Sequence, residues 1–331
     1  MNIRLLDCTL RDGSHVNGGD FGVKTIKNIL TSLNSSKIDI IEAGFLRDVN
    51  YKSGSSIFNK LENFEALIKN KFTSQVSLMI RPDQYDINKL DKKSEYVDIL
   101  RFAFHKKDIE LTKSYIDKAL DLGYKVGVNP VNIGAYSVND IEDILSQISC
   151  FPIDSVAVVD TFGALKKDTF FDICKIFEQN LTESIDLGIH LHENLSLSFG
   201  LICDYLEFGN KNRNIIIDSS LFGMGRIPGN LCTEIIMSHL IKEYNKEYSL
   251  APSLDVISKE IEPIKSKINW GYSPVYLLTA DKNIHRSYGE FLSNQGVNYS
   301  IANDILDEIQ QLDKGEKYDE DLVIKLLEKY N

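Results

Sequence analysis

Arg11, Asp12 and His15 lie within five residues of one another in the stretch LRDGSH, which follows an apolar run near the N-terminus. A plain connecting turn needs glycine and sometimes an aspartate, but it does not need a guanidinium, a carboxylate and an imidazole together. Such groups suit the stabilisation of negative charge, the binding of a cation and the transfer of a proton. The composition of this stretch therefore predicts a functional role for it.

A second group of this kind is IHLHEN, in which His190 and His192 are separated by one residue. Along a β-strand, side chains at positions i and i+2 point to the same face, so the two imidazoles are expected to point together. Two imidazoles at a strand end suit a divalent cation that takes an oxygen ligand from elsewhere. Asp12 is the natural candidate, although a His-x-His pair alone is weak evidence for a metal site.

The elements that must position these side chains alternate between apolar runs and amphipathic stretches such as 108–123 and 138–150. Nearly continuous apolar runs are typical of parallel strands that are covered by helices on both faces. Eight such runs favour a closed (β/α)8 TIM barrel over an open doubly wound sheet, and no GxGxxG follows the first run. The predicted strands are 3–9, 38–45, 76–82, 97–105, 125–130, 155–163, 186–194 and 214–223.

After about residue 245 the alternation stops, and helical patterns dominate to the end of the chain. A charged segment, 312–322, separates the last helix from those before it and reads as a linker. We therefore predict a catalytic barrel over 1–245 and a C-terminal helical appendage over 246–331.

Active sites of TIM barrels are built where the strands end, and nearly every predicted strand carries a polar or ionisable group there. Some of these groups also have structural interpretations: His105 as a helix cap or core residue, and Asp218 as a residue that orders the last barrel turn. His239 reads as structural, His285 as a loop residue and Cys232 as an inert thiol. The predicted substrate contacts are Glu42, Arg81, His105, Asn129 and Asp160.

The glycine-rich stretch LFGMGRIPGN, residues 221–230, follows the eighth predicted strand. Barrels often bind phosphate after strands seven and eight, so this stretch could cradle a phosphate group. It could equally let the backbone pass close to a metal site, with Asn230 supplying an amide oxygen. The sequence leaves both interpretations open.

The overall composition narrows the classes of partner. The formal net charge of −11 argues against nucleic acid or an anionic membrane surface, but locally gathered basic groups could still bind a small anionic substrate. The five cysteines are scattered and form no CxxC, which fits reduced thiols. With no signal-peptide pattern and no long apolar run, the expected location is the cytoplasm.

Three stretches, TLRDGSH, HLHENLSLSFG and DSSLFGMGRIPGNLCTE, together resemble the HMG-CoA lyase-like superfamily of metal-dependent aldolases and lyases. The resemblance covers about residues 1–240 with the motifs in the same order. RDGSH is most similar to the 4-hydroxy-2-oxovalerate aldolase branch, whereas condensing synthases usually have RDGEQ and HMG-CoA lyases RDGLQ at this place.

This resemblance implies ligands for a divalent metal, Mn²⁺ or Mg²⁺: Asp12, His190 and His192, with Asn230 as a further ligand or a close neighbour. It also implies that Arg11 stabilises an enolate oxygen and that His15 takes the proton from the substrate hydroxyl. Tyr272, in NWGYS, matches a tyrosine of the aldolases over a short stretch only.

The activity so implied is that of a class II aldolase, which cleaves or forms a C–C bond of a 4-hydroxy-2-oxo acid and so interconverts it with pyruvate, or a related 2-oxo acid, and an aldehyde. Alternatives are a Claisen-type acyltransferase that condenses an acyl-CoA with a 2-oxo acid, and a non-catalytic binding barrel. The stretch VNGGDFG, the residues Arg226 and Pro228, and the C-terminal segment depart from the aldolase pattern. Substrate identity, a partner aldehyde dehydrogenase and a homodimer therefore stay open.

Overall fold

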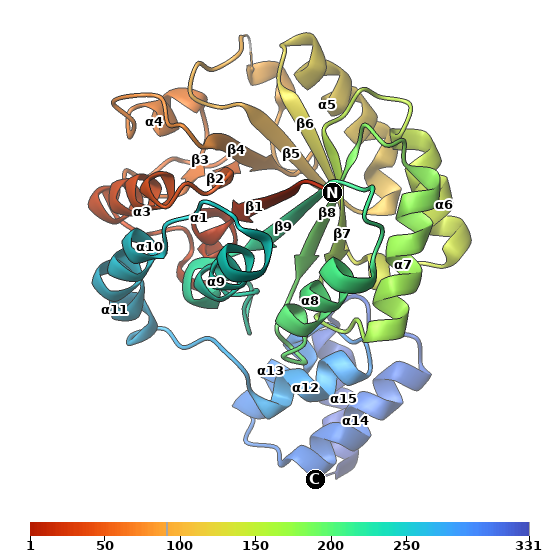
Figure 1. Ribbon diagram of the computed structural model, residues 1–331. Helices are drawn as coiled ribbons and strands as arrows, with labels where there is room; N and C mark the ends of the chain where they lie inside the picture. The colour runs from red at the N-terminus through yellow and green to blue at the C-terminus, as the bar shows by residue number, and fades with distance from the viewer. Residues whose placement is uncertain (91, 331) are drawn as a thin grey trace.

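The computed structural model describes residues 1–90 and 92–330, and its centre is a closed barrel of eight parallel strands (Figure 1). The first strand pairs with both the second and the last, which closes the ring. The predicted TIM barrel is therefore confirmed. The barrel strands are β1 (Ile3–Asp7), β2 (Ile40–Leu46), β4 (Gln75–Ile80), β5 (Ile99–Phe104), β6 (Lys125–Pro130), β7 (Ser155–Asp160), β8 (Asp186–Leu191) and β9 (Ile215–Ser219).

Several strands end earlier than predicted. The runs 155–163, 186–194 and 214–223 extend into the loops that follow β7, β8 and β9, so His192 lies one residue beyond β8 and forms an isolated bridge with Asn230. The reactive stretch after β1 is not an open turn, because it coils into two single-turn helices, α1 (Thr9–Asp12) and α2 (Ser14–Asn17).

Amphipathic helices surround the barrel and bury their apolar faces against the outer surface of the strands. The predicted helices at 108–123 and 138–150 are present with slightly shorter bounds, and Ser137 and Asp140 form a capping box at the start of the second. The surrounding helices are α3 (Val23–Ser35), α4 (Leu61–Glu65), α5 (Ile109–Asp121), α6 (Val138–Ile148), α7 (Lys167–Asn180), α8 (Ser198–Phe208) and α9 (Thr233–Tyr244).

A ninth strand, β3 (Ile57–Phe58), was not predicted, because two residues are too few to show a periodic pattern. It pairs with the end of β2, next to the place where the register between β2 and β4 shifts, between Glu42 and Phe45. Gly44 lies inside this shift with a φ of 150°, and a Cβ there would come within 2.0 Å of the Ser56 carbonyl oxygen. A glycine is therefore required at the point where the backbone of Ser56 passes close to β2.

The C-terminal region has two parts (Figure 1). The helices α10 (Leu250–Val256) and α11 (Glu262–Lys265), joined by a π-helical turn over Ile257–Ile261, pack against the barrel and share its core. The second part has its own small core around Tyr288 and Leu306. Its helices are α12 (Pro274–Asp281), α13 (Ser287–Asn294), α14 (Tyr299–Gln311) and α15 (Glu320–Leu327).

The charged segment 312–322 is ordered by contacts with this small core. The hydroxyl of Tyr288 lies 2.9 Å from the carbonyl oxygens of both Lys314 and Lys317. Asp319 then caps α15 by accepting a hydrogen bond from the backbone N–H of Leu322.

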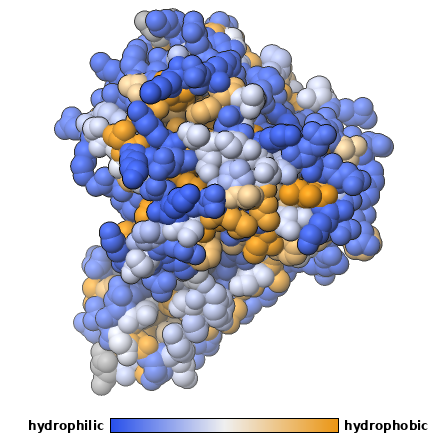
Figure 2. Space-filling view, turned by 60° about the vertical axis from the view of Figure 1, so that its left-hand side comes forward, coloured by the Kyte–Doolittle hydropathy of each residue, from blue (hydrophilic) through white to orange (hydrophobic). Residues whose placement is uncertain are grey.

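In the part of the chain that the structure describes, no helix is both long and apolar enough to cross a bilayer. Figure 2 shows a large body and a narrower one below it, with hydrophobic side chains gathered in a patch near their junction and a hydrophilic surface over most of the remainder.

Candidate metal centre

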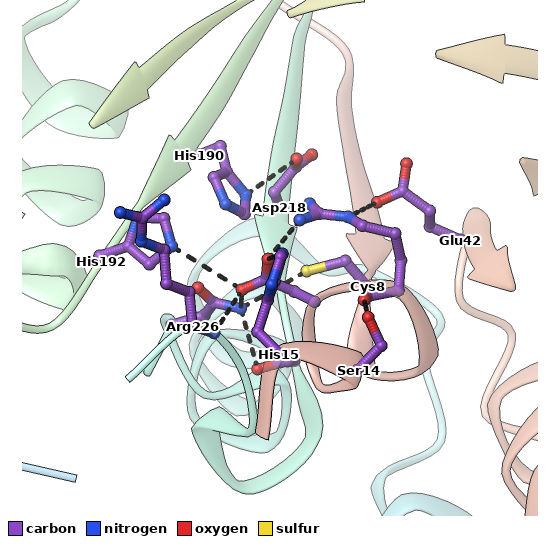
Figure 3. Close-up of polar contacts among 12 residues, drawn as sticks. Cys8, Ser14, His15, Glu42, His190, His192, Asp218 and Arg226 are labelled. Carbon is purple, nitrogen blue, oxygen red and sulfur yellow. Dashed lines mark hydrogen bonds and ion pairs between the residues drawn. The ribbon is translucent and has the colours of Figure 1, made fainter. Parts of the chain in front are cut away.

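Asp12, His190 and His192 come together at or just beyond the carboxyl ends of β1 and β8. Figure 3 shows the two imidazoles beside each other, with Asp218 next to His190. One candidate ligand atom from each residue lies within 4.8 Å of the other two, and all three residues are buried. The two imidazole rings lie 4.9 Å apart between centroids, as expected of side chains at positions i and i+2. The fold therefore brings the predicted carboxylate and the predicted imidazoles to one place.

Each imidazole lies close to a second polar group. Nδ1 of His192 lies 2.8 Å from the carbonyl oxygen of Asp160, so Nδ1 carries the proton and the lone pair is on Nε2. That Nε2 lies 3.7 Å from Oδ2 of Asp12. Nδ1 of His190 lies 3.1 Å from Oδ2 of Asp218, a close electrostatic contact, although this nitrogen has no hydrogen bond to a described residue.

Asp12 is held as a carboxylate by donors on both oxygens. Its Oδ2 accepts hydrogen bonds from the backbone N–H of Arg226 at 2.9 Å and from Nδ2 of Asn230 at 2.7 Å, while Oδ1 accepts from Nη1 of Arg11. Burial alone would raise the pKa of Asp12, but the charge of Arg11 and the contact with His192 keep it well below its usual range. The group is therefore negatively charged at neutral pH.

The residues present fit a divalent cation. Nε2 of His192 and Oδ1 of Asn230 are buried and have no hydrogen-bond partner among residues 1–90 and 92–330. Unpartnered buried polar atoms are costly, and both of these carry lone pairs beside a carboxylate. Two imidazoles and one carboxylate are a common donor set for divalent metals, with the remaining positions left to water and substrate.

A line of buried charges runs from this centre into the barrel. Nε of Arg11 donates to Glu42 at 2.6 Å, and Arg101 bridges Glu42 at 3.0 Å and Asp218 at 2.7 Å. Asp12, Glu42 and Asp218 alternate with the two arginines, so the line carries a net charge of −1 with neutral histidines. A divalent cation at its end would offset that charge.

Arg101 was missed by the sequence reasoning, and Asp218 was read only as a residue that orders a turn. A signal for both was present, because Glu42, Arg101 and Asp218 are single charges inside otherwise apolar strands. Charges buried in this way must pair with one another or bind a ligand. Gly127, the partner of Arg101 on β6, makes room for it: a Cβ there would lie 3.0 Å from Cγ of Arg101.

The glycine-rich loop after β9 passes directly beside the metal centre. A Cβ on Gly225 would lie 2.4 Å from Oδ2 of Asp12 and 2.2 Å from Nδ2 of Asn230. Of the two interpretations of this loop, the contacts support close backbone passage, since its backbone and Asn230 hold Asp12.

We expect Gly225→Ala to weaken Mn²⁺ binding by about 10–100-fold, the range seen when groups that orient metal ligands are changed. The added methyl must displace the Asp12 carboxylate or the Asn230 amide. Isothermal titration with Mn²⁺ measures the change. Gly200→Ala is the matched control, because a Cβ on this α8 residue meets nothing within 4 Å. Unchanged affinity in Gly225→Ala would show that the loop does not constrain the ligands.

His15 lies at the rim of the centre, with Nε2 3.8 Å from Oδ1 of Asp12 and its ring edge-on to Phe45. Its side chain is 40% exposed, so solvent or substrate can reach it. Partial burial lowers the pKa of His15 to about 4, with the nearby Asp12 acting in the opposite direction and Arg11 adding to the decrease. The imidazole is therefore neutral at pH 7.

The other predicted site residues are spread around the same end of the barrel. Arg81 is paired with Asp83, and His105 is half-buried at the end of β5 with no hydrogen bond to a described side chain. Asn129 is buried, and its Oδ1 has no partner among the described residues. Of these three, Asn129 best keeps the predicted role of a substrate contact.

Two predicted substrate contacts have their carboxylates occupied by protein groups. Glu42 is fully buried between Arg11 and Arg101. Asp160 accepts the backbone N–H groups of Ala164 and Leu165, and burial raises its pKa to about 6. We propose positioning roles for both.

Tyr272 was predicted to be catalytic. It lies in the loop before α12, is 58% exposed, and makes no hydrogen bond to any described residue. Its neighbour Gly271 donates its N–H to the Pro228 carbonyl of the glycine-rich loop, and the catalytic role of Tyr272 stays a prediction.

Known proteins resemble this chain in sequence and in fold. Residues 2–256 match the HMGL-like family. A 4-hydroxy-2-oxovalerate aldolase of Bacillus cereus is 24% identical over 300 residues, which is 86% of each chain, and one of Carboxydothermus hydrogenoformans is 25% identical over 294 residues, or 83% of this chain and 84% of that one.

Solved structures share the fold. The HMG-CoA lyase of Brucella melitensis superposes with a TM-score of 0.66 at 15% identity, covering 80% of this chain and 99% of that one. The carboxyl transferase domain of Rhizobium etli pyruvate carboxylase, with pyruvate, gives a TM-score of 0.71 at 14% identity and covers 99% of this chain and 60% of that one. With a family match over most of its length and the barrel that goes with it, this chain belongs to the HMGL-like family.

Proposed function

We propose that this protein is a metal-dependent, class II aldolase that cleaves or forms the C–C bond of a 4-hydroxy-2-oxo acid, with pyruvate or a related 2-oxo acid and an aldehyde as the other reactants. The observation that carries the proposal is the convergence of Asp12, His190 and His192 beside Arg11 and His15. The similarity to curated 4-hydroxy-2-oxovalerate aldolases supports it.

The bond to be broken joins C3, which is alpha to the carbonyl, and C4, which carries the hydroxyl group. Cleavage removes the proton of the 4-hydroxyl group and releases the aldehyde while negative charge moves onto the carbonyl oxygen, and the resulting enolate takes up a proton at C3 to give the 2-oxo acid. Asp12, His190 and His192 would hold the cation, which we propose to be Mn²⁺ or Mg²⁺, with Asn230 as a further ligand or neighbour. When bound, such an ion supplies Lewis acidity toward the 2-oxo acid.

Arg11 supplies a fixed positive charge at the same place. Its Nε and Nη1 are held by Glu42 and Asp12, which leaves Nη2 without a hydrogen bond to any described residue. A donor that is held in place before the reaction can stabilise a developing oxyanion by several kcal/mol. We therefore assign the enolate-stabilising role to Nη2 of Arg11.

His15 is suited to carry the hydroxyl proton. A neutral imidazole at the rim of the site can accept a proton at Nε2 and return it to the product in the opposite direction. Asp12, 3.8 Å away, would stabilise the imidazolium that forms.

The proposal is tested by measuring pyruvate release from 4-hydroxy-2-oxo acids with added Mn²⁺ and after treatment with EDTA. We expect activity with Mn²⁺, its loss in EDTA and its return when the metal is restored. Full activity in the chelated protein would exclude a metal-dependent mechanism. Thiol release from acetyl-CoA with a 2-oxo acid would instead favour the Claisen-type alternative.

We expect His15→Ala to lower kcat by about 10²–10⁴-fold, the usual contribution of a general base, while Mn²⁺ affinity stays within about threefold. His15 is not among the converging ligands, so the two effects should separate. His239→Ala is the control, because this residue packs between Phe199 and Tyr244 on the outer helices. A kcat equal to that of the unmodified protein would refute the role of His15 as base.

A further inference from the structure

Arg226 is a half-buried cation at the metal centre whose charge is not used by the mechanism above. Its backbone N–H binds Asp12, but no carboxylate among residues 1–90 and 92–330 lies within 4.0 Å of its guanidinium nitrogens. Of the two carboxylates whose charges act on it, Asp12 already has both oxygens occupied by other donors, and Glu290 pairs with Arg286. Arg226 therefore keeps an unpaired positive charge beside the substrate site.

The small C-terminal core places a histidine and a second arginine next to Arg226. Burial, together with the charges of Arg226 and Arg286, lowers the pKa of His285 to about 4, so this imidazole is neutral at pH 7, and its Nδ1 accepts a hydrogen bond from the Ser287 N–H at 3.2 Å. Nε2 of His285 lies 3.4 Å from a guanidinium nitrogen of Arg226, and its ring stands edge-on to Phe162, in the loop after β7. The neighbouring Arg286 pairs with Glu290, but its Nε is buried without a partner among the described residues. Burial first, and then the charge of Arg286, lower the pKa of Arg226 to about 10.

The placement of these residues is fixed by contacts that tie the C-terminal region to the rim of the barrel. Lys166, after β7, forms an ion pair with Asp281 at 2.7 Å. Trp270 donates its Nε1 hydrogen to the Phe222 carbonyl at 3.0 Å, and the Gly271 N–H binds the Pro228 carbonyl at 2.7 Å. The glycine-rich loop is thus held from both sides, so its arginine has a defined position.

We propose that Arg226, with Arg286 beside it and His285 packed against its guanidinium, binds a negatively charged group on the aldehyde portion of the substrate, so that the preferred aldehyde carries a carboxylate or a phosphate. This inference rests on the proposed aldolase function and names the class of its second substrate.

The physical reason is the cost of an unpaired, partly buried guanidinium. Such a group is stable only when an anion or water completes its hydrogen bonds, and a planar fork of donors matches carboxylate and phosphate oxygens especially well. A small aliphatic aldehyde offers no such partner. The chain is strongly acidic overall, so basic residues gathered at the active end of the barrel favour a specific anion there.

The test compares matched aldehydes in the condensation with pyruvate: 4-oxobutanoate against butanal, and glyceraldehyde 3-phosphate against glyceraldehyde. For the unmodified protein we expect that, in one of the two pairs, kcat/KM for the charged aldehyde is about 10–100-fold higher than kcat/KM for the neutral aldehyde. Which pair shows the preference distinguishes carboxylate from phosphate. In Arg226→Gln the ratio of the two kcat/KM values should fall to about threefold or less. The loss should come from a higher KM for the charged aldehyde.

Lys329→Gln is the control, because this lysine pairs with Glu308 on the exterior of the small core and should leave both ratios unchanged. Equal use of charged and neutral aldehydes by the unmodified protein would overturn the proposal. So would an Arg226→Gln variant that raises the KM of pyruvate instead. A protein that condenses none of the four aldehydes with pyruvate and also releases no pyruvate from 4-hydroxy-2-oxo acids contradicts the aldolase function itself.

A binding measurement makes the proposal testable without turnover. We expect succinate or inorganic phosphate, titrated into the Mn²⁺-loaded protein in the presence of pyruvate, to bind about 10–100-fold more weakly to Arg226→Gln than to the unmodified protein. Equal affinities in the two proteins would overturn the assignment of the anion to Arg226 even if the aldolase activity is present.

Discussion

Replacing Asp12 with asparagine is expected to weaken Mn²⁺ binding by well over 100-fold and to lower kcat/KM by about 10³-fold or more. Changes to groups that only orient ligands already cost 10–100-fold in metal affinity, and here the sole carboxylate of the converging group is lost. The asparagine side chain has nearly the same shape as that of aspartate, so altered packing would not explain the weaker Mn²⁺ binding. Its NH₂ group would also face the donors that now bind Asp12, the Arg226 N–H and the Asn230 amide.

The measurement is titration of each protein with Mn²⁺, followed by pyruvate release at saturating metal. Asp20→Asn is the matched control, because this exposed aspartate lies in the same N-terminal region and pairs only with Lys52 among the described cations. Mn²⁺ affinity in Asp12→Asn equal to that of the unmodified protein would place the cation elsewhere. Normal affinity with lost turnover would instead restrict Asp12 to a role in the reaction.

The barrel was predictable because its signal is repeated. Eight nearly continuous apolar runs, separated by amphipathic stretches, leave few arrangements other than a closed parallel barrel. The sequence does not show the residue at which each strand ends. Phe162 and His192 continue an extended, partly apolar pattern, but they already belong to loops. The two-residue β3 and the register shift at Gly44 depend on a contact with a distant loop, which no local pattern encodes.

The convergence of the three candidate ligands was predictable for a different reason. Asp12, His190 and His192 have side chains that only a few kinds of site use, and strand geometry sets their direction. The groups around them were harder to predict, because they depend on partners far away in the sequence. The apolar strand around Glu42 does not show that this carboxylate lies between two arginines. His285 lies in a loop, as predicted, but its local sequence does not show that it lies against Arg226.

Arg101 provides the second large effect, because it binds two carboxylates inside the barrel. We expect Arg101→Met to lower the free energy of unfolding by about 3–5 kcal/mol, since Glu42 and Asp218 would share the barrel interior without their common cation. Urea denaturation followed by circular dichroism measures this change. The variant should also bind Mn²⁺ more weakly, because Asp218 contacts His190.

The double variant Arg101→Met/Asp218→Asn separates charge balance from simple loss of packing. Removing one positive and one negative charge restores the net charge of the line, so part of the lost stability should return, although metal binding should not. Arg4→Met is the matched control: Arg4 also bridges two aspartates, but it lies at the start of β1 and is partly exposed, so its loss should cost about 1 kcal/mol and leave Mn²⁺ affinity unchanged. The loss in free energy of unfolding in the double variant could instead equal the sum of the losses in the two single variants. The buried charges would then act independently, and the line of ion pairs from Asp12 to Asp218 would not act as one unit in holding the metal ligands.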